Sequence, residues 1–159
     1  MSGDSKMPTS EQLAYFAGFF DGEGCVYILK RKPRSSRGEI NPAYQLCINI
    51  TNTNPNTILL IKQYYGGYIG IQNQNNENWR PCFRLVISSF GAERFLRDVY
   101  PYLILKKEEA SIGLQFRSSF PKMQKHPTPK KELLRREIAK TKLQELKRAT
   151  HICGSEFIN

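Results

Sequence analysis

The stretch that decides the fold reads Leu13-Ala14-Tyr15-Phe16-Ala17-Gly18-Phe19-Phe20-Asp21-Gly22-Glu23-Gly24. A capping box precedes it, because Thr9 stands three residues before Gln12, and its apolar residues recur at helical spacing. The helix is expected to stop near Asp21, where glycines flank Glu23. The stretch therefore predicts a helix with a carboxylate at its C-terminal end.

Two features of this helix have separate physical uses. Ala14, Ala17 and Gly18 lie three and four residues apart, which predicts a flat strip where a second helix can approach closely, as at a subunit interface. Glu23 lies just past the last turn, where backbone carbonyls such as that of Gly22 also point outward. Hard divalent cations bind such oxygens, so this helix end is a candidate metal site.

The residues that follow predict a mixed α and β chain. Alternation of apolar and polar side chains indicates strands at residues 25–32, 44–52, 67–72 and 79–89. Helical spacing and breaker residues indicate further helices at residues 54–65, 91–100 and 107–116. The expected order is α-β-β-α-β-β-α, which belongs to the α+β class.

Each predicted strand has a core face and a wet face. The expected core side chains are Val26, Ile28, Leu46, Ile48, Ile50, Ile69, Ile71, Phe83, Leu85 and Ile87. The opposite faces carry polar and basic side chains, and the candidates for DNA contact are Tyr27, Arg31, Gln45, Asn49, Gln72, Arg80 and Arg84. Arginine reads guanine and the side-chain amides read adenine in the major groove, so these positions are expected to set specificity.

The length, charge and residue composition of the chain restrict the classes of molecule that it could bind. The 159 residues, 40% of them hydrophobic, suit one domain, and the formal net charge of +10 favours a polyanion, most commonly nucleic acid, over an acidic protein. No long apolar run and no signal pattern occur, so we expect no membrane span and no secretion, hence an intracellular protein. Four scattered cysteines and two histidines argue against a structural zinc site.

The ends of the chain are expected to lie outside the core. Residues 1–8 resemble a flexible lead-in, residues 9–120 are the expected core, and prolines 121, 127 and 129 mark a loop. Residues 130–149 predict a charged helix with a thin apolar stripe, formed by Leu133, Leu134, Ile138, Leu143 and Leu146. Residues 154–159 begin with what two adjacent cloning sites would encode, so a vector origin and a native origin both stay open.

The stretch from Phe16 to Gly24 resembles the signature of the LAGLIDADG homing endonucleases, and the chain holds one copy of it. The resemblance implies the αββαββα homing-endonuclease fold, with a concave antiparallel DNA-binding sheet and additional C-terminal helices. It also implies a homodimer in which paired motif helices bring both copies of Glu23 side by side over double-stranded DNA. Mg²⁺ would be the metal cofactor, with Mn²⁺ able to substitute, and no small-molecule cofactor is implied.

The resemblance also assigns roles. The segment from Tyr100 to Lys107 is similar to the one that carries the family's active-site lysine, which places Lys106 there, and Asn52 matches a polar residue that helps hold water near the metals. Asn56 departs from a basic residue common in close relatives. The implied activity is intron or intein homing, by a double-strand break with short 3′ overhangs in a long pseudo-palindromic target.

Two other functions remain open at this point. A maturase that assists RNA splicing would use the same basic sheet without a metal-bound carboxylate pair. A catalytically silent DNA-binding protein would share the scaffold, although retention of both Glu23 and Lys106 argues against it. The compartment, whether chloroplast, mitochondrion, cytoplasm or nucleus, also remains open.

Overall fold

The structure is a computed structural model that describes residues 7–72, 75, 77–120 and 127–155. The described elements are α1 (Ser10–Glu23), β1 (Gly24–Arg31), a 3₁₀ turn (Ser35–Arg37), β2 (Ala43–Asn52), α2 (Asn56–Tyr65), β3 (Tyr68–Gln72), β4 (Cys82–Ser88), α3 (Ser89–Val99), a second 3₁₀ turn (Tyr100–Tyr102), α4 (Lys107–Ser118) and α5 (Lys130–Ser155). The predicted α+β order is confirmed. The predictions for residues 1–6, 121–126 and 156–159 lie outside the described residues.

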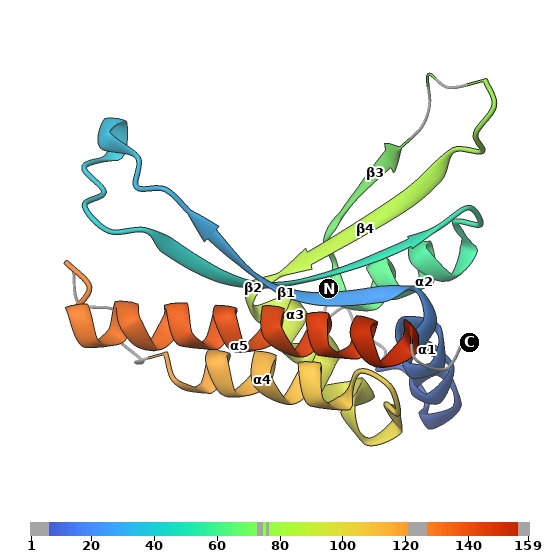
Figure 1. The fold of residues 1–159 in the computed structure, drawn as a ribbon. Helices are drawn as coiled ribbons and strands as arrows, with labels where there is room; N and C mark the ends of the chain where they lie inside the picture. The colour runs from blue at the N-terminus through green and yellow to red at the C-terminus, as the bar shows by residue number, and fades with distance from the viewer. Residues whose placement is uncertain (1–6, 73–74, 76, 121–126, 156–159) are drawn as a thin grey trace.

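The four strands form one antiparallel sheet in the order β1-β2-β4-β3. Figure 1 shows the helices gathered on one side of this sheet, while the hairpins β1–β2 and β3–β4 spread apart on the other side. The sheet is therefore curved, and its helix-free face lies on the inside of the bend. This shape follows from the twist that accumulates between strands when one face is left uncovered.

The hydrophobic core lies between the sheet and the helices. Leu46, Ile48 and Ile50 on β2 are fully buried, and Phe16 and Phe20 of α1 pack into the same cluster. The α1 capping box is present as expected, since the Thr9 side chain accepts the amide of Gln12 and the Gln12 side chain accepts the amide of Thr9. The core faces expected for β1 and β2 are confirmed.

Some expected boundaries and faces are wrong. β4 begins at Cys82 and not at residue 79, because Pro81 has no amide hydrogen to donate to a neighbouring strand. Ile71 is 45% exposed, because it lies near the far end of the β3–β4 hairpin, beyond the cover of the helices. Cys47 points to the helix-free face of the sheet, where neighbouring side chains bury it.

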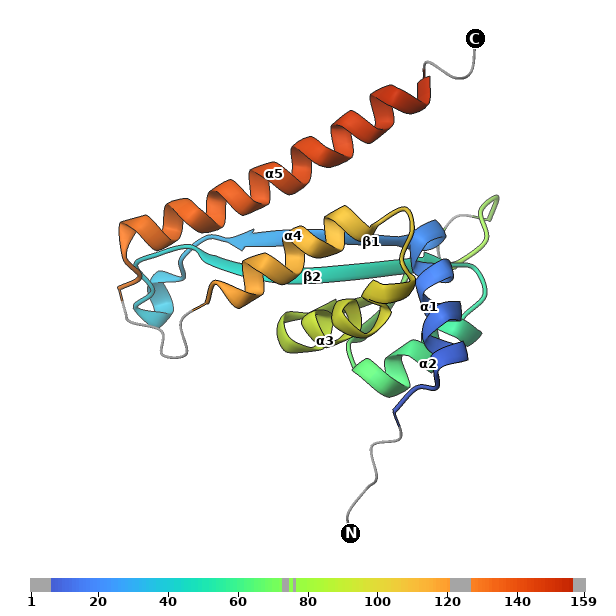
Figure 2. The same ribbon diagram turned by 90° about the horizontal axis from the view of Figure 1, so that it is seen from below.

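The charged C-terminal helix α5 extends to Ser155, further than expected. Figure 2 shows α5 running beside α4 and β1. Only part of the predicted apolar stripe is covered: Leu143 is buried, whereas Leu134 and Ile138 stay exposed. Within the described residues, none of the helices has the length and apolar content needed to cross a membrane.

Candidate nucleic-acid cleavage site

The junction between α1 and β1 places Glu23 at an open helix end. Glu23 is the last residue of α1 and is exposed, as is Gly22 before it. Gly24 makes the tight exit possible, because a Cβ atom there would lie 2.0 Å from the Phe20 ring. The helix therefore stops at a fixed place, and the carboxylate of Glu23 stands at the start of the first strand.

Asp21 ties a distant segment to this helix end. Its carboxylate is 8% exposed and accepts the backbone amides of Ile104 (2.8 Å), Leu105 (3.1 Å) and Lys106 (2.9 Å). These amides lead into α4, where the first N–H groups of a helix lack partners within the helix. Asp21 therefore fixes the backbone of the loop that leads into α4, a role that the sequence analysis did not assign to it.

Lys106 lies at the same place, as the resemblance implied. Its ammonium donates a hydrogen bond to the backbone carbonyl of Asp21, with 2.5 Å between the two atoms. A cation at a helix C-terminus is favoured by the partial negative charge of the last carbonyls. The Lys106 ammonium is thereby held at the carbonyl of Asp21, which precedes Gly22 by one residue and Glu23 by two.

Asn52 lies at the sheet end nearest to this site. It is the last residue of β2, two residues beyond Ile50, which pairs with Gly24. Its side-chain oxygen accepts the amide of Asn54 at 2.8 Å, and the side chain of Asn54 in turn accepts the amide of Asn56. The Asn52 oxygen therefore accepts one hydrogen bond in shaping the turn into α2, and a contact to water can use its second lone pair or the amide nitrogen.

A metal at Glu23 would need ligands from outside one chain. Within the described ranges, no group of three or more His, Cys, Asp or Glu side chains could hold a metal ion. The oxygens available at this helix end are the Glu23 carboxylate and the nearby backbone carbonyl of Gly22. Such a set suits a hard cation that completes its shell with phosphate oxygens and a second copy of the helix.

The exposed strip of small residues on α1 differs from the predicted one. Ala14 and Gly18 are exposed, and a Cβ at Gly18 or Gly22 would meet no atom within 4 Å. Ala17, however, is completely buried against the core of the same chain, since the i, i+3 step turns it inward. The small-residue strip open to a partner is therefore Ala14, Gly18 and Gly22.

The helix-free face of the sheet collects most of the predicted DNA-contact residues. The register pairs Tyr27 with Cys47 and Cys25 with Asn49, and it pairs Thr51 with Arg84 and Arg84 with Gly70. The residues that share this face by strand alternation are Tyr27, Arg31, Gln45, Asn49, Gln72 and Arg84. Arg80 is not among them, because it lies in the connection before β4.

Arg84 stands near the middle of this face. Its Nε atom is buried and has no hydrogen-bond partner in the part of the chain that the structure describes. Gly70, its neighbour on β3, carries no side chain to cover it. On β1, burial raises the pKa of Tyr27, so this phenol stays neutral and able to donate a hydrogen bond.

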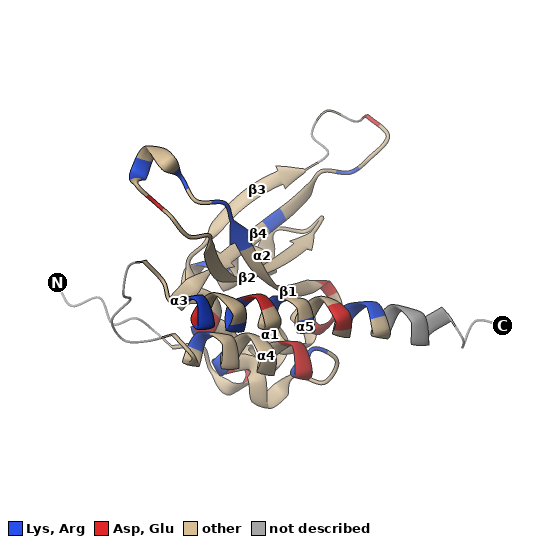
Figure 3. Ribbon diagram, turned by 60° about the vertical axis from the view of Figure 1, so that its left-hand side comes forward, with Lys and Arg blue, Asp and Glu red and all other residues tan. Residues whose placement is uncertain are grey.

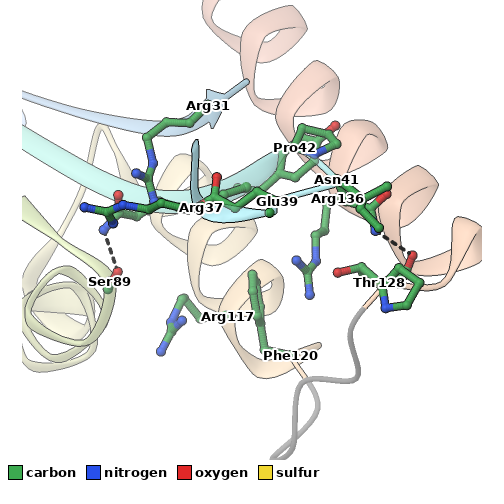
Figure 4. A pocket seen from close by; sticks show the side chains of 16 residues that line it. Arg31, Arg37, Glu39, Asn41, Pro42, Ser89, Arg117, Phe120, Thr128 and Arg136 are labelled. Carbon is green, nitrogen blue, oxygen red and sulfur yellow. Dashed lines mark hydrogen bonds between the residues drawn. The ribbon is translucent and has the colours of Figure 1, made fainter. Parts of the chain in front are cut away.

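Basic side chains also surround the far end of the β1–β2 hairpin. Figure 3 shows Lys and Arg on both hairpins and along α5. A pocket of about 700 Å³ opens there, with Arg31, Arg37, Arg117 and Arg136 in its lining (Figure 4). Arg117 and Arg136 pair with Glu93 and Glu132 and lie over the ring of Phe120, a cluster that the sequence analysis missed.

Comparison with known proteins agrees with this geometry. The family model described as LAGLIDADG endonuclease matches residues 16–104, more than half of the chain, so the chain belongs to this family. No curated protein matches it significantly by sequence.

Among solved structures, the homing endonuclease I-CvuI in complex with the I-CreI target is similar in fold. The TM-score is 0.68 at 20% identity, over 86% of this chain and 82% of that one. The archaeal intron-encoded homing endonuclease I-Vdi141I, complexed with DNA, gives a TM-score of 0.53 at 19% identity, over 68% of this chain and 67% of that one. The predicted homing-endonuclease fold is confirmed.

Proposed function

We propose that this chain is a site-specific, metal-dependent DNA endonuclease that works as a homodimer and cuts both strands of a long pseudo-palindromic target. The observation that carries the proposal is the convergence of Glu23 and Lys106 at the C-terminal end of α1, held there by Asp21. This point lies at the edge of a polar sheet face whose curvature suits a duplex. Family membership supports nuclease chemistry at such a site.

A dimer follows from the stoichiometry of the site. One chain supplies one Glu23 carboxylate, whereas a double-strand break needs a cleavage centre for each strand. The exposed strip Ala14, Gly18 and Gly22 allows a second α1 to approach closely. Ile104 and Leu105 beside the helix end are 83% and 75% exposed, and a second copy would cover such apolar side chains.

In the proposed reaction, Glu23 and the carbonyl of Gly22 would hold Mg²⁺, or Mn²⁺ in its place. The metal supplies charge stabilisation and a more acidic bound water when present. Lys106 stabilises the negative charge that develops on the scissile phosphate, and Asn52 orients the attacking water. Attack forms the new P–O bond and breaks the P–O3′ bond, which leaves a 5′ phosphate and a 3′ hydroxyl. We expect short 3′ overhangs.

The sheet face provides the specificity. I-CvuI in complex with the I-CreI target and I-Vdi141I complexed with DNA share this fold. By analogy, Tyr27, Gln45, Asn49 and Arg84 read base edges, while Arg31 and Arg37 at the hairpin end meet phosphates. Phosphate contacts add affinity and salt dependence more than sequence choice.

The deciding experiment is cleavage of a randomised pseudo-palindromic DNA library by wild type, Glu23→Gln and Glu11→Gln in Mg²⁺, with EDTA as a control. Glu11 is an exposed acid in the first turn of the same helix, far from the site, so its variant is the matched control. We expect wild type and Glu11→Gln to cut one enriched sequence class, and Glu23→Gln to lose cleavage by about 10²-fold or more while still binding DNA.

Other results point to the other functions. Sequence-specific binding without cleavage by wild type would indicate a silent DNA-binding protein. Failure to bind duplex DNA, together with binding to structured RNA, would indicate a splicing maturase.

A further inference from the structure

The C-terminal helix α5 contacts the first residues of β1, which follow Glu23 directly in the chain. β1 is the edge strand of the sheet, so alternate backbone carbonyls point away from β2 and lack strand partners. Lys147 of α5 donates a hydrogen bond to one of these, the carbonyl of Val26, and its ammonium also lies 2.8 Å from the Cys25 sulfur. Cys25 and Val26 follow Glu23 by two and three residues.

The same ammonium reaches α4. The Glu109 carboxylate lies 3.8 Å from the Nζ atom of Lys147, and Glu109 follows Lys106 by three residues, about one helical turn. Oε2 of Glu109 is buried, and no hydrogen-bond donor meets it among the described residues. The Lys147 charge therefore compensates a carboxylate that would be costly to leave buried alone.

A second contact fixes how α5 lies along β1. Glu137 accepts a hydrogen bond from Lys30 at 2.7 Å and another from the Tyr44 hydroxyl. From Glu137 to Lys147 the helix rises by about 15 Å, and from Lys30 back to Val26 the strand spans about 13 Å, so both anchors can be held at once. The helix thus runs antiparallel to the strand with Lys147 at the active-site end.

We infer that Lys147 is a positioning residue of the cleavage site, which fixes the α1–β1 junction that carries Glu23 relative to the helix that follows Lys106. The inference rests on the proposed nuclease function. Asp21 already joins α1 to the loop before α4 through its four hydrogen bonds with residues 104–106. Lys147 adds a second contact, between Val26 of β1 and Glu109 of α4, and so restricts the orientation of Glu23 relative to Lys106.

The test compares Lys147→Met, which keeps the length of the side chain without the charge, with Lys147→Arg and with Lys142→Met. Lys142 is an exposed lysine of the same helix, so its variant controls for lost positive charge. Single-turnover cleavage is measured with saturating full-length protein in Mg²⁺, and DNA affinity is measured in Ca²⁺, at a temperature where melting curves show each variant folded. Amide hydrogen exchange at residues 24–26 and 104–106 gives a readout independent of cleavage.

We expect Lys147→Met to lower the single-turnover rate by about tenfold, since small misplacements of catalytic groups have large kinetic effects. DNA affinity should stay within about twofold, exchange in both segments should be faster, and Lys147→Arg should recover most of the rate. The inference is overturned if Lys147→Met cleaves like Lys142→Met, or if exchange in both segments is unchanged. A wild type that never cuts would instead refute the proposed function.

Discussion

The carboxylate of Asp21 accepts the backbone amide of Lys106 at 2.9 Å, while the ammonium of Lys106 donates to the backbone carbonyl of Asp21 at 2.5 Å. Each of these residues, eighty-five positions apart, thus forms one hydrogen bond through its side chain to a backbone group of the other. These two hydrogen bonds bring α1 and the loop before α4 together at one site.

The first prediction concerns this pair. Asp21→Asn leaves an amide group where a carboxylate accepted three backbone N–H groups, so at least one buried donor loses its partner. We expect unfolding free energy to fall by about 2 kcal/mol and cleavage to fall more than tenfold, because the backbone of residues 104–106, which carries Lys106, loses part of its anchor. Urea unfolding and single-turnover cleavage measure the two effects. An Asp98→Asn variant serves as control, since the Asp98 carboxylate accepts a hydrogen bond from the Tyr65 hydroxyl and not from the backbone amides before α4. Normal cleavage by a folded Asp21→Asn protein would contradict this role.

The second prediction concerns Arg84 as a reader of bases. Arg84 is partly exposed near the middle of the helix-free face, where a guanidinium is placed to meet the base edges of a bound duplex. Arg84→Ala is expected to weaken binding to the selected target by about 1–3 kcal/mol and to relax sequence choice at one position of each half-site. Binding to a library of single-position target variants measures both effects. Equal loss on every sequence would show that Arg84 contacts only phosphates.

The third prediction concerns salt dependence at the hairpin end. Arg37 is exposed in the lining of the basic pocket, and a phosphate contact there would release about one counterion. For Arg37→Gln we expect the slope of log K against log salt to become less negative by about 2 for the dimer, about 1 for each copy, with unchanged sequence preference. Arg97→Gln on α3, where Arg97 is exposed and paired with Glu93, is the matched control. Shortening the duplex at both ends should erase the difference between Arg37→Gln and wild type. A slope that does not change would place Arg37 away from the DNA.

The fourth prediction concerns pH. Hydrogen bonds from Lys30 and then Tyr44 lower the pKa of Glu137 from its ordinary 4.5 to about 2. A lowered folded-state pKa stabilises the protein above the unfolded value, so this contribution is complete above about pH 5 and is lost as pH falls toward 2. Because the pair is more than one third exposed, solvent screening reduces the effect to about 1 kcal/mol. Urea unfolding of wild type and Glu137→Gln between pH 7 and 2 should converge at the acid end. Parallel curves would refute the assignment.

Much of the fold follows from local sequence patterns. The capping box at Thr9, the strand alternation around Ile48 and the glycines at residues 66 and 67 each act through neighbours in the chain. The errors occur where elements distant in the sequence decide the outcome: the exposure of Ile71 and the burial of Ala17. These outcomes depend on which surfaces other elements cover.

By itself, the sequence determined the element order, the two-faced strands and the position of Glu23 at a helix end, because spacing and capping are properties of adjacent residues. It placed Lys106 and Asn52 only through resemblance to a family. The tertiary structure alone decided that Asp21 holds the loop before α4, that Lys147 joins β1 to α4, and that four arginines line one pocket. These contacts join residues tens of positions apart, and their geometry exists only once the core has packed and the chain's buried polar groups have found partners.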